Sequence, residues 1–324
     1  MTTKTWSTAA VLGVTALLAT ACGGGTDLSD AGSGGGGGTA GGGSIAEDYD
    51  FSGTSATVGS KEFTESVVLG QITLAALQAA GADVEDQTGL TGTDTVRAAL
   101  ESGDIDMYWE YTGTGWVNIL GNTTEDLPED LFTAVAEADA ANDVAWLEPA
   151  PFEDTYRLAT SADLAEREGL ETTSDAAAFV SANPDQGSIC AASEFLNRDD
   201  GLPGLQTAYG FEFSEVVELD LGLIYTQVGD SCAFGEVFST DARIVSNDLV
   251  VLEDDKDFFV PYNGALTLRQ EVLADNPEIA DLFAEISELI TDEVITELNS
   301  KVDNDGEEVA DVAQQFLRDN GFID

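Results

Sequence analysis

The sequence contains no histidine, and only 11 of its 324 residues are lysine or arginine. Histidine is the commonest general base and metal ligand, so its absence argues against an enzyme or a metal centre. Nucleic-acid binding needs a basic surface, which a chain with 62 acidic residues and a net charge of −51 does not have. Neither a Gly-x-Ser-x-Gly motif nor a phosphate-binding Gly-Lys-Ser/Thr loop is present. No enzymatic activity, cofactor, metal or nucleic-acid partner is therefore expected.

Long apolar runs are also scarce, and the one near the N-terminus, residues 9–19, is about half as long as a membrane-spanning helix. Lys4 precedes it, and small residues ending in Cys22 follow it. This resembles a bacterial lipoprotein signal peptide over residues 1–22, with Cys22 lipidated and the protein exported to the outer face of the cell membrane. An ordinary signal peptide with an incidental cysteine is the alternative. Glycine-rich residues 23–53 predict a flexible tether.

Cysteine is rare, with three residues in the chain. If Cys22 carries lipid, Cys190 and Cys232 remain as a pair in an exported protein, where disulfides persist. Each begins an apolar run that predicts a strand. A disulfide between them is expected, and two buried free thiols are the alternative.

Strand-like and helix-like patterns alternate from residue 56 to residue 111. The expected elements are a strand at 56–58, a helix capped by Thr64 and stopped by Gly81, an extended segment before a turn at 89–92, a helix at about 93–102 and a strand at 105–111. This order predicts a parallel α/β sheet, in which ligands bind beyond the carboxyl ends of the strands. Lys61 and Tyr111 both lie at such ends.

Several motifs in this region occur together in one known family. They are Gly-Ser-Lys-x-Phe-Thr-Glu at 59–65, Gly-Thr-Asp at 92–94, Ala-Leu-Glu-Ser-Gly at 99–103 and Glu-Tyr-Thr-Gly-Thr at 110–114. With further matches downstream, residues 55–324 resemble the substrate-binding proteins of ABC transporters for glycine betaine, choline and related osmoprotectants.

The resemblance implies a type II periplasmic-binding-protein fold, an α/β fold with two lobes, a ligand cleft and a two-segment hinge. Lobe I is expected at 54–154 and 262–324, and lobe II at 155–261. The implied partners are a small quaternary amine and the permease and ATPase subunits of an ABC importer. The binding protein itself is expected to be a monomer.

The resemblance also implies an aromatic cage at four motif positions: Tyr111, Tyr156, Phe238 and Tyr262. A trimethylammonium group has no N–H to donate, so aromatic faces must hold it through the ring quadrupole. Phe238 stands where the family pattern has tyrosine. It keeps the ring face and lacks the hydroxyl.

A carboxylate on the ligand needs cations and donors, and the resemblance implies Arg198, Lys61 and Thr114 for this purpose. A buried guanidinium without an anionic partner is costly, so glycine betaine or proline betaine is expected to bind more tightly than choline. Pairing of Arg198 with Asp199 or Asp200 is the alternative. A receptor for choline, carnitine or another small amino compound is the alternative function.

The net charge of −51 predicts that salt stabilises this protein. Acidic side chains repel one another in the compact state, and the Debye length falls to about 3 Å at 1 M salt. The melting temperature should therefore climb from low salt to molar KCl. A melting temperature that stays flat or falls over this range would contradict the prediction.

Overall fold

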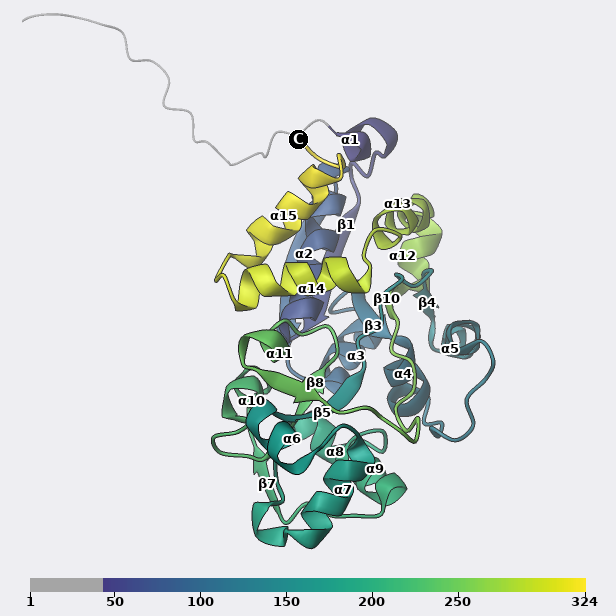
Figure 1. Cartoon of the computed structure of the whole chain (residues 1–324). Coiled ribbons are helices and arrows are strands. Elements are labelled where there is room, and N and C mark those ends of the chain that lie inside the picture. The colour runs from purple at the N-terminus through teal and green to yellow at the C-terminus, as the bar shows by residue number, and fades with distance from the viewer. Residues whose placement is uncertain (1–42) are drawn as a thin grey trace, which may run out of the picture. The chain divides into compact units, whose positions relative to one another are not determined.

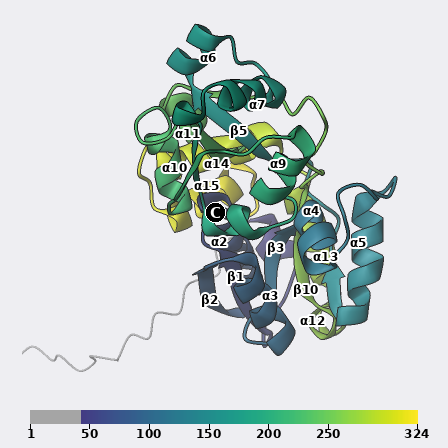
Figure 2. The same ribbon diagram turned by 90° about the horizontal axis from the view of Figure 1, so that it is seen from below.

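The computed structural model describes residues 43–324, which contain two five-stranded sheets with helices packed on them (Figures 1 and 2). The expected signal peptide, Cys22 and residues 23–42 of the expected tether lie outside the described residues. Each sheet, with its helices, forms one lobe. None of the helices in residues 43–324 has the length and apolar character needed to cross a membrane.

The sheet of lobe I has the strand order β2-β1-β3-β10-β4. Its strands are β1 (Ser55–Lys61), β2 (Asp83–Leu90), β3 (Met107–Tyr111), β4 (Val144–Trp146) and β10 (Gly264–Arg269). β1 is parallel to β2 and β3, which brings the ends of β1 and β3 to the same edge of the sheet. Lys61 and Tyr111, the last residues of these two strands, are therefore neighbours at that edge.

The parallel pairing predicted for residues 56–111 is confirmed by β1, β2 and β3, but the complete sheet is mixed, because β10 pairs antiparallel with both β3 and β4. No strand was predicted at this place in the sequence. Gly264 to Leu268 are buried on both faces of the sheet, so they lack the alternation of apolar and polar residues that marks a half-exposed strand. The run is also too short to be distinguished from a helix by its pattern.

Helices cover both faces of this sheet. They are needed on both, because successive side chains of β3 point to opposite faces of the sheet and are apolar on each. Met107 and Trp109 pack in the core on the side of α2, and Tyr108 packs on the opposite side with Val96 and Leu100 of α3. The helices of lobe I are α1 (Ser44–Asp48), α2 (Thr64–Ala79), α3 (Thr93–Ser102), α4 (Thr112–Thr114), the π-helix Gly115–Ile119, α5 (Leu131–Asp139), the 3-10 helix Ala140–Asn142, α12 (Gln270–Asp275), α13 (Glu278–Ser287), α14 (Asp292–Asp303) and α15 (Val309–Asp319).

The C-terminal helices α14 and α15 pack on α2, so the end of the chain returns to lobe I as expected (Figure 1). α1 joins the same lobe: Ile45 and Phe51 are buried, and the backbone N–H groups of Ser44 and Ile45 donate to Gly321 O and Phe322 O. The predicted flexible tether is therefore wrong for residues 44–53. These ten residues supply apolar side chains and backbone donors to the folded domain.

Lobe II has the strand order β7-β6-β8-β5-β9. Its strands are β5 (Tyr156–Ser161), β6 (Ser188–Ala191), β7 (Glu215–Glu218), β8 (Phe234–Phe238) and β9 (Leu249–Val251). Its helices are α6 (Ala162–Glu168), α7 (Thr173–Ala182), the 3-10 helix Pro184–Gln186, α8 (Ser193–Asn197), α9 (Leu202–Tyr209), α10 (Leu221–Gln227) and α11 (Arg243–Ser246). The chain passes between the lobes twice, at residues 147–155 and 252–263, which is the two-segment connection that the fold class predicts.

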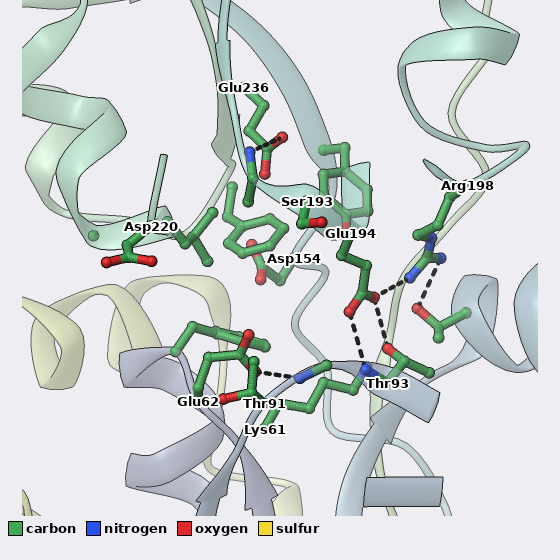
Figure 3. Close-up of a pocket in the computed structure, with 18 of the residues that line it drawn as sticks. Lys61, Glu62, Thr91, Thr93, Asp154, Ser193, Glu194, Arg198, Asp220 and Glu236 are labelled. Atoms are coloured by element: carbon green, nitrogen blue, oxygen red, sulfur yellow. Dashed lines mark hydrogen bonds and ion pairs between the residues drawn. The ribbon is translucent and has the colours of Figure 1, made fainter. Parts of the chain in front are cut away.

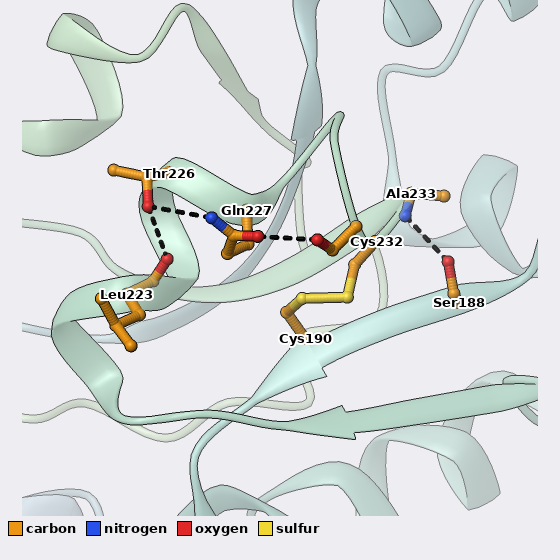
Figure 4. The surroundings of a disulfide bond; sticks show 8 residues. Ser188, Cys190, Leu223, Thr226, Gln227, Cys232 and Ala233 are labelled. Atoms are coloured by element: carbon orange, nitrogen blue, oxygen red, sulfur yellow. Dashed lines mark hydrogen bonds between the residues drawn. A yellow bond between two sulfur atoms is a disulfide. The ribbon is translucent and has the colours of Figure 1, made fainter.

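Cys190 in β6 and Cys232 just before β8 form a disulfide, with their Cα atoms 5.6 Å apart (Figure 4). Both residues are buried in a small apolar cluster with Ile224 and Tyr225 of α10. The bond joins the start of β8 to its parallel neighbour and fixes the loop that follows α10.

Removal of this disulfide is expected to destabilise the protein. The two cysteines are 42 residues apart, for which chain entropy predicts a loss of about 4 kcal/mol in the free energy of unfolding. The Cys190→Ala/Cys232→Ala variant should therefore unfold at lower denaturant concentration than the wild type. Dithiothreitol should lower the stability of the wild type and leave the variant unchanged. Equal stability of the two proteins under oxidising conditions would contradict the prediction.

Candidate ligand-binding site

A cavity of about 1170 Å³ lies between the lobes and is lined by residues of both. It contains every residue that the sequence analysis assigned to ligand binding, namely Lys61, Tyr111, Thr114, Tyr156, Arg198, Phe238 and Tyr262. The fold explains this convergence. Lys61, Tyr111 and Phe238 end their strands, and Tyr156 begins a strand antiparallel to β8, directly opposite Phe238.

The aromatic rings form a connected set along the cavity. Tyr156 lies 4.9 Å from Phe238 and 5.7 Å from Tyr262, ring centroid to ring centroid, and the second pair is almost perpendicular. Phe63, which sequence reasoning missed, connects Phe238 at 5.1 Å with Tyr111 at 6.0 Å. Phe63 could have been predicted from the sequence, since it belongs to the first family motif and immediately precedes α2.

Carboxylates hold two of the tyrosine rings in place. The Tyr111 hydroxyl donates to Glu65 at 2.8 Å, and the Tyr262 hydroxyl donates to Asp200 at 2.6 Å. Burial, reinforced by these carboxylates, raises the pKa of both phenols well above the ordinary value. Both tyrosines therefore remain neutral hydrogen-bond donors, and their ring orientations are fixed by the acids behind them.

Arg198 is buried and has anionic partners, which corrects the expectation of an unpaired guanidinium. Its Nε and Nη2 donate to the two oxygens of Asp200 at 2.8 and 2.6 Å, and its Nη1 donates to Glu194 at 2.7 Å. Nη2 also donates to the Thr114 hydroxyl at 3.2 Å (Figure 3). The pairing with Asp200, stated above as the alternative, is the one that the structure contains. The argument that Arg198 requires a zwitterionic ligand therefore loses its premise.

Lys61 is likewise engaged. Its Nζ donates to Glu110 at 2.6 Å, and the two side chains are 6% and 0% exposed. The same Nζ lies 5.2 Å from the centroid of the Tyr111 ring, and the Arg198 guanidinium carbon lies 5.5 Å from that of Tyr156. Two rings of the aromatic set thus already contact cations of the protein, which is the interaction expected for aromatic faces.

Glu194 connects the two lobes, and sequence reasoning did not single it out. It belongs to α8 of lobe II and accepts hydrogen bonds from Thr93 N at 3.0 Å and from Thr93 Oγ1 at 2.7 Å, at the start of α3 in lobe I (Figure 3). Burial raises its pKa, but the charges of Lys61 and Arg198 and the hydrogen bonds from Thr93 outweigh burial and lower the pKa to about 2. Glu194 is therefore ionised. The sequence feature that could have identified Glu194 is its position four residues before Arg198, in the α8 region.

Two further buried carboxyls share a single hydroxyl. Thr240 Oγ1 lies 2.5 Å from Glu65 Oε2 and 2.8 Å from Asp154 Oδ1. A hydroxyl can donate only one proton, so one of the two contacts requires a proton on a carboxyl group. Burial raises the pKa of both acids, and the charge of Glu65 raises that of Asp154 further. Asn299 Nδ2 donates to Glu65 at 3.2 Å and ties α14 to this pair.

The remaining charged lining of the cavity is mostly acidic. It comprises Glu62, Asp94, Glu218, Asp220 and the single further cation Arg243. Asp154 and Glu236 also line the cavity, but burial raises the pKa of both carboxyls well above the ordinary value, so they are not counted as charges. Such a wall favours a cationic ligand over an anion. Within residues 43–324, no group of three or more acidic, cysteine or histidine side chains is arranged to hold a metal ion.

Comparison with known proteins is consistent with this site. Residues 55–319 match the family model OpuAC, described as the substrate binding domain of ABC-type glycine betaine transport system. A glycine-betaine-binding protein of Pseudomonas aeruginosa is 37% identical over 276 residues, covering 82% of this chain and 88% of that protein. The carnitine transport binding protein OpuCC of Listeria monocytogenes is 29% identical over 274 residues, covering 82% and 87%. A crystal structure described as a glycine betaine/carnitine/choline ABC transporter superposes with a TM-score of 0.66 at 25% identity, covering 83% of this chain and 100% of that one.

The raised pKa of Asp154 predicts a pH-dependent stability. At Asp154 the folded state keeps a proton that the unfolded chain loses above about pH 3.9. The contribution of this proton to the free energy of unfolding is therefore complete below that pH, and it is lost as the pH rises through the pKa that Asp154 has in the folded state. Asp154→Asn keeps an oxygen for Thr240 and has no proton to lose. Its free energy of unfolding should therefore increase relative to the wild type as the pH rises from about 4 to neutrality.

Urea denaturation of both proteins across this pH range measures the difference. The control is Asp163→Asn, which removes an exposed carboxylate from α6 and should show a difference nearly independent of pH. If the difference in free energy of unfolding between Asp154→Asn and the wild type is equally independent of pH, the buried proton is absent and the prediction is wrong.

Proposed function

Because the chain belongs to the family of substrate-binding domains of ABC-type glycine betaine transport systems, we propose that it binds a quaternary ammonium osmoprotectant between its lobes and delivers it to the permease of an importer. The chain is a binding component of a transporter and not an enzyme. The observation that carries the choice of ligand class is the connected set of rings along the cavity, Phe63, Tyr111, Tyr156, Phe238 and Tyr262.

The chemistry of the ligand explains why rings are needed. A trimethylammonium group is a cation with no hydrogen-bond donor, so carboxylates alone cannot orient it. Each aromatic face contributes about 0.5–2 kcal/mol when water is excluded. The acidic lining of the cavity adds a long-range attraction for the cation. An amino acid or polyamine would instead need oriented acceptors for its N–H groups.

Glycine betaine is the first candidate ligand within this class. The Pseudomonas aeruginosa relative is named for it, and the Listeria monocytogenes relative is named for carnitine, which makes carnitine and choline the alternatives. Lys61, Arg198 and Thr114 are the groups proposed to face the second functional group of the ligand. Each of them lines the cavity, and Lys61 and Arg198 also lie over the rings of Tyr111 and Tyr156.

The proposal extends to the cellular arrangement. Cys22 would carry the lipid that holds the protein at the outer face of the cell membrane, and the mature protein would act as a monomer beside its permease and ATPase subunits. The Cys190–Cys232 disulfide supports an extracytoplasmic location, because such bonds persist in oxidising compartments.

Phe238 offers the cleanest test of the aromatic cage. Mutation of Tyr111 or Tyr262 to alanine would also remove one hydrogen bond from the buried acid Glu65 or Asp200, whereas Phe238 is half-buried and carries no polar group. Phe238→Ala should weaken glycine betaine binding about 2- to 30-fold, and Phe238→Tyr should retain it. Isothermal titration calorimetry gives both dissociation constants.

The matched control is Phe132→Ala, which removes a half-buried ring of α5 that is not part of the lining of this cavity. It should leave the affinity unchanged. Wild-type affinity in Phe238→Ala, with a normal melting temperature, would contradict the cage assignment.

A further inference from the structure

The carboxylate of Glu194 reaches from α8 of lobe II to the start of α3 in lobe I. Its two oxygens accept from the backbone N–H and the hydroxyl of Thr93 and from Nη1 of Arg198. These groups are typical of a carboxylate site: an N–H at the first residue of a ten-residue helix, a hydroxyl and a guanidinium. In this structure a side chain of the protein fills that site.

The cations of this site already face carboxylates of the protein. The Nε–Nη2 edge of the Arg198 guanidinium donates to both oxygens of Asp200, and Nη2 also donates to the Thr114 hydroxyl. Lys61, the nearest other cation of the site, is paired with Glu110. Three carboxylates therefore surround two cations that line the cavity. A ligand carboxylate placed there would be a fourth anion next to groups that are already neutralised.

Glu194 is also the most exposed of the three residues Glu194, Arg198 and Asp200. Its side chain is 29% exposed, whereas the side chains of Arg198 and Asp200 are 3% and 0% exposed. Figure 3 shows Glu194 extending across the cavity between Arg198 and Thr93. An incoming carboxylate could replace it at Thr93 and Arg198, while Asp200 would remain fixed behind the guanidinium.

We propose that Glu194 is a specificity-determining residue: it competes with the carboxylate of a betaine for Thr93 and Arg198, and so shifts selectivity toward quaternary ammonium ligands whose second group is uncharged. Choline, which carries a hydroxyl there, binds with Glu194 in place and can donate to a carboxylate. Glycine betaine has to displace Glu194. The inference rests on the proposed function, because it assumes that the rings hold the shared trimethylammonium group.

The test compares glycine betaine with choline, because they share this group and differ in the second one. Both dissociation constants are measured by calorimetry for the wild type and for Glu194→Gln, which removes the charge and keeps the shape. The ratio of betaine affinity to choline affinity should increase about tenfold or more in Glu194→Gln, since a repelling charge near the carboxylate is lost. Any weakening of lobe closure affects both ligands and cancels in the ratio.

The matched control is Glu218→Gln, which removes an exposed carboxylate at the end of β7 that lines the same cavity. Its ratio should change less than about threefold, as expected for a more distant, solvated charge. Glu194→Asp, which keeps the charge on a shorter side chain, separates charge from packing. It should keep the ratio closer to the wild-type value than to that of Glu194→Gln.

The outcomes are distinct. An unchanged ratio in Glu194→Gln, an equal change in Glu218→Gln, or an increase in Glu194→Asp as large as that in Glu194→Gln overturns the role of Glu194 and leaves the proposed function standing. Failure of the wild type and of Glu218→Gln to bind either ligand overturns the proposed function, and with it this inference. If Glu194→Gln melts far below the wild type, the comparison of Glu194→Asp with the wild type replaces it. An increased ratio of betaine affinity to choline affinity in Glu194→Asp, which retains the charge, overturns the inference. An unchanged ratio supports it.

Discussion

The pairing of Arg198 with Asp200 and Glu194 is the interaction on which the arrangement of the binding cavity depends. A guanidinium that is 4% exposed must be neutralised, because burying an isolated charge costs far more than a single contact can return. Asp200 neutralises Arg198 with both of its carboxylate oxygens, and it also accepts a hydrogen bond from the Tyr262 hydroxyl. One buried cation therefore determines the position of an aromatic ring and of the acid that reaches across to the other lobe.

The same constraint shapes the rest of a chain with so few basic residues. Arg97 is buried against Asp139, which also accepts from the Trp146 indole, and Lys61 is buried against Glu110. Buried pairs of this kind add little net stability compared with apolar residues, yet loss of either partner is costly. Three of the scarce cations, Lys61, Arg97 and Arg198, thus hold the geometry of the interior, while much of the acidic excess lies on the surface.

The cavity carries two kinds of chemistry side by side. Rings from both lobes offer faces to a cation that cannot donate a hydrogen bond. Next to the rings of Tyr111 and Tyr156, cations of the protein pair with acids of the protein, Lys61 with Glu110 and Arg198 with Asp200 and Glu194. The rings can recognise the ammonium group that all quaternary amines share. Discrimination between members of the class has to come from the paired charges, where exchange of partners is possible.

Local pattern and motif in the sequence were sufficient to predict the two-lobed α/β fold, the helices α2 and α3, the disulfide and the cavity in which the seven assigned residues meet. The helices follow from short-range periodicity, which neighbouring residues largely determine. The two-lobed fold and the site residues were implied by the family motifs, and the disulfide was expected from the two cysteines that remain in an exported chain. The tertiary structure alone decided that β10 inserts antiparallel between β3 and β4, that Ile45 joins the core, and that Arg198 pairs with Asp200 and Glu194. A fully buried short strand has no periodic signal, and in a chain with 62 acids the partner of a given cation depends on which carboxylate the fold brings within 3 Å of it.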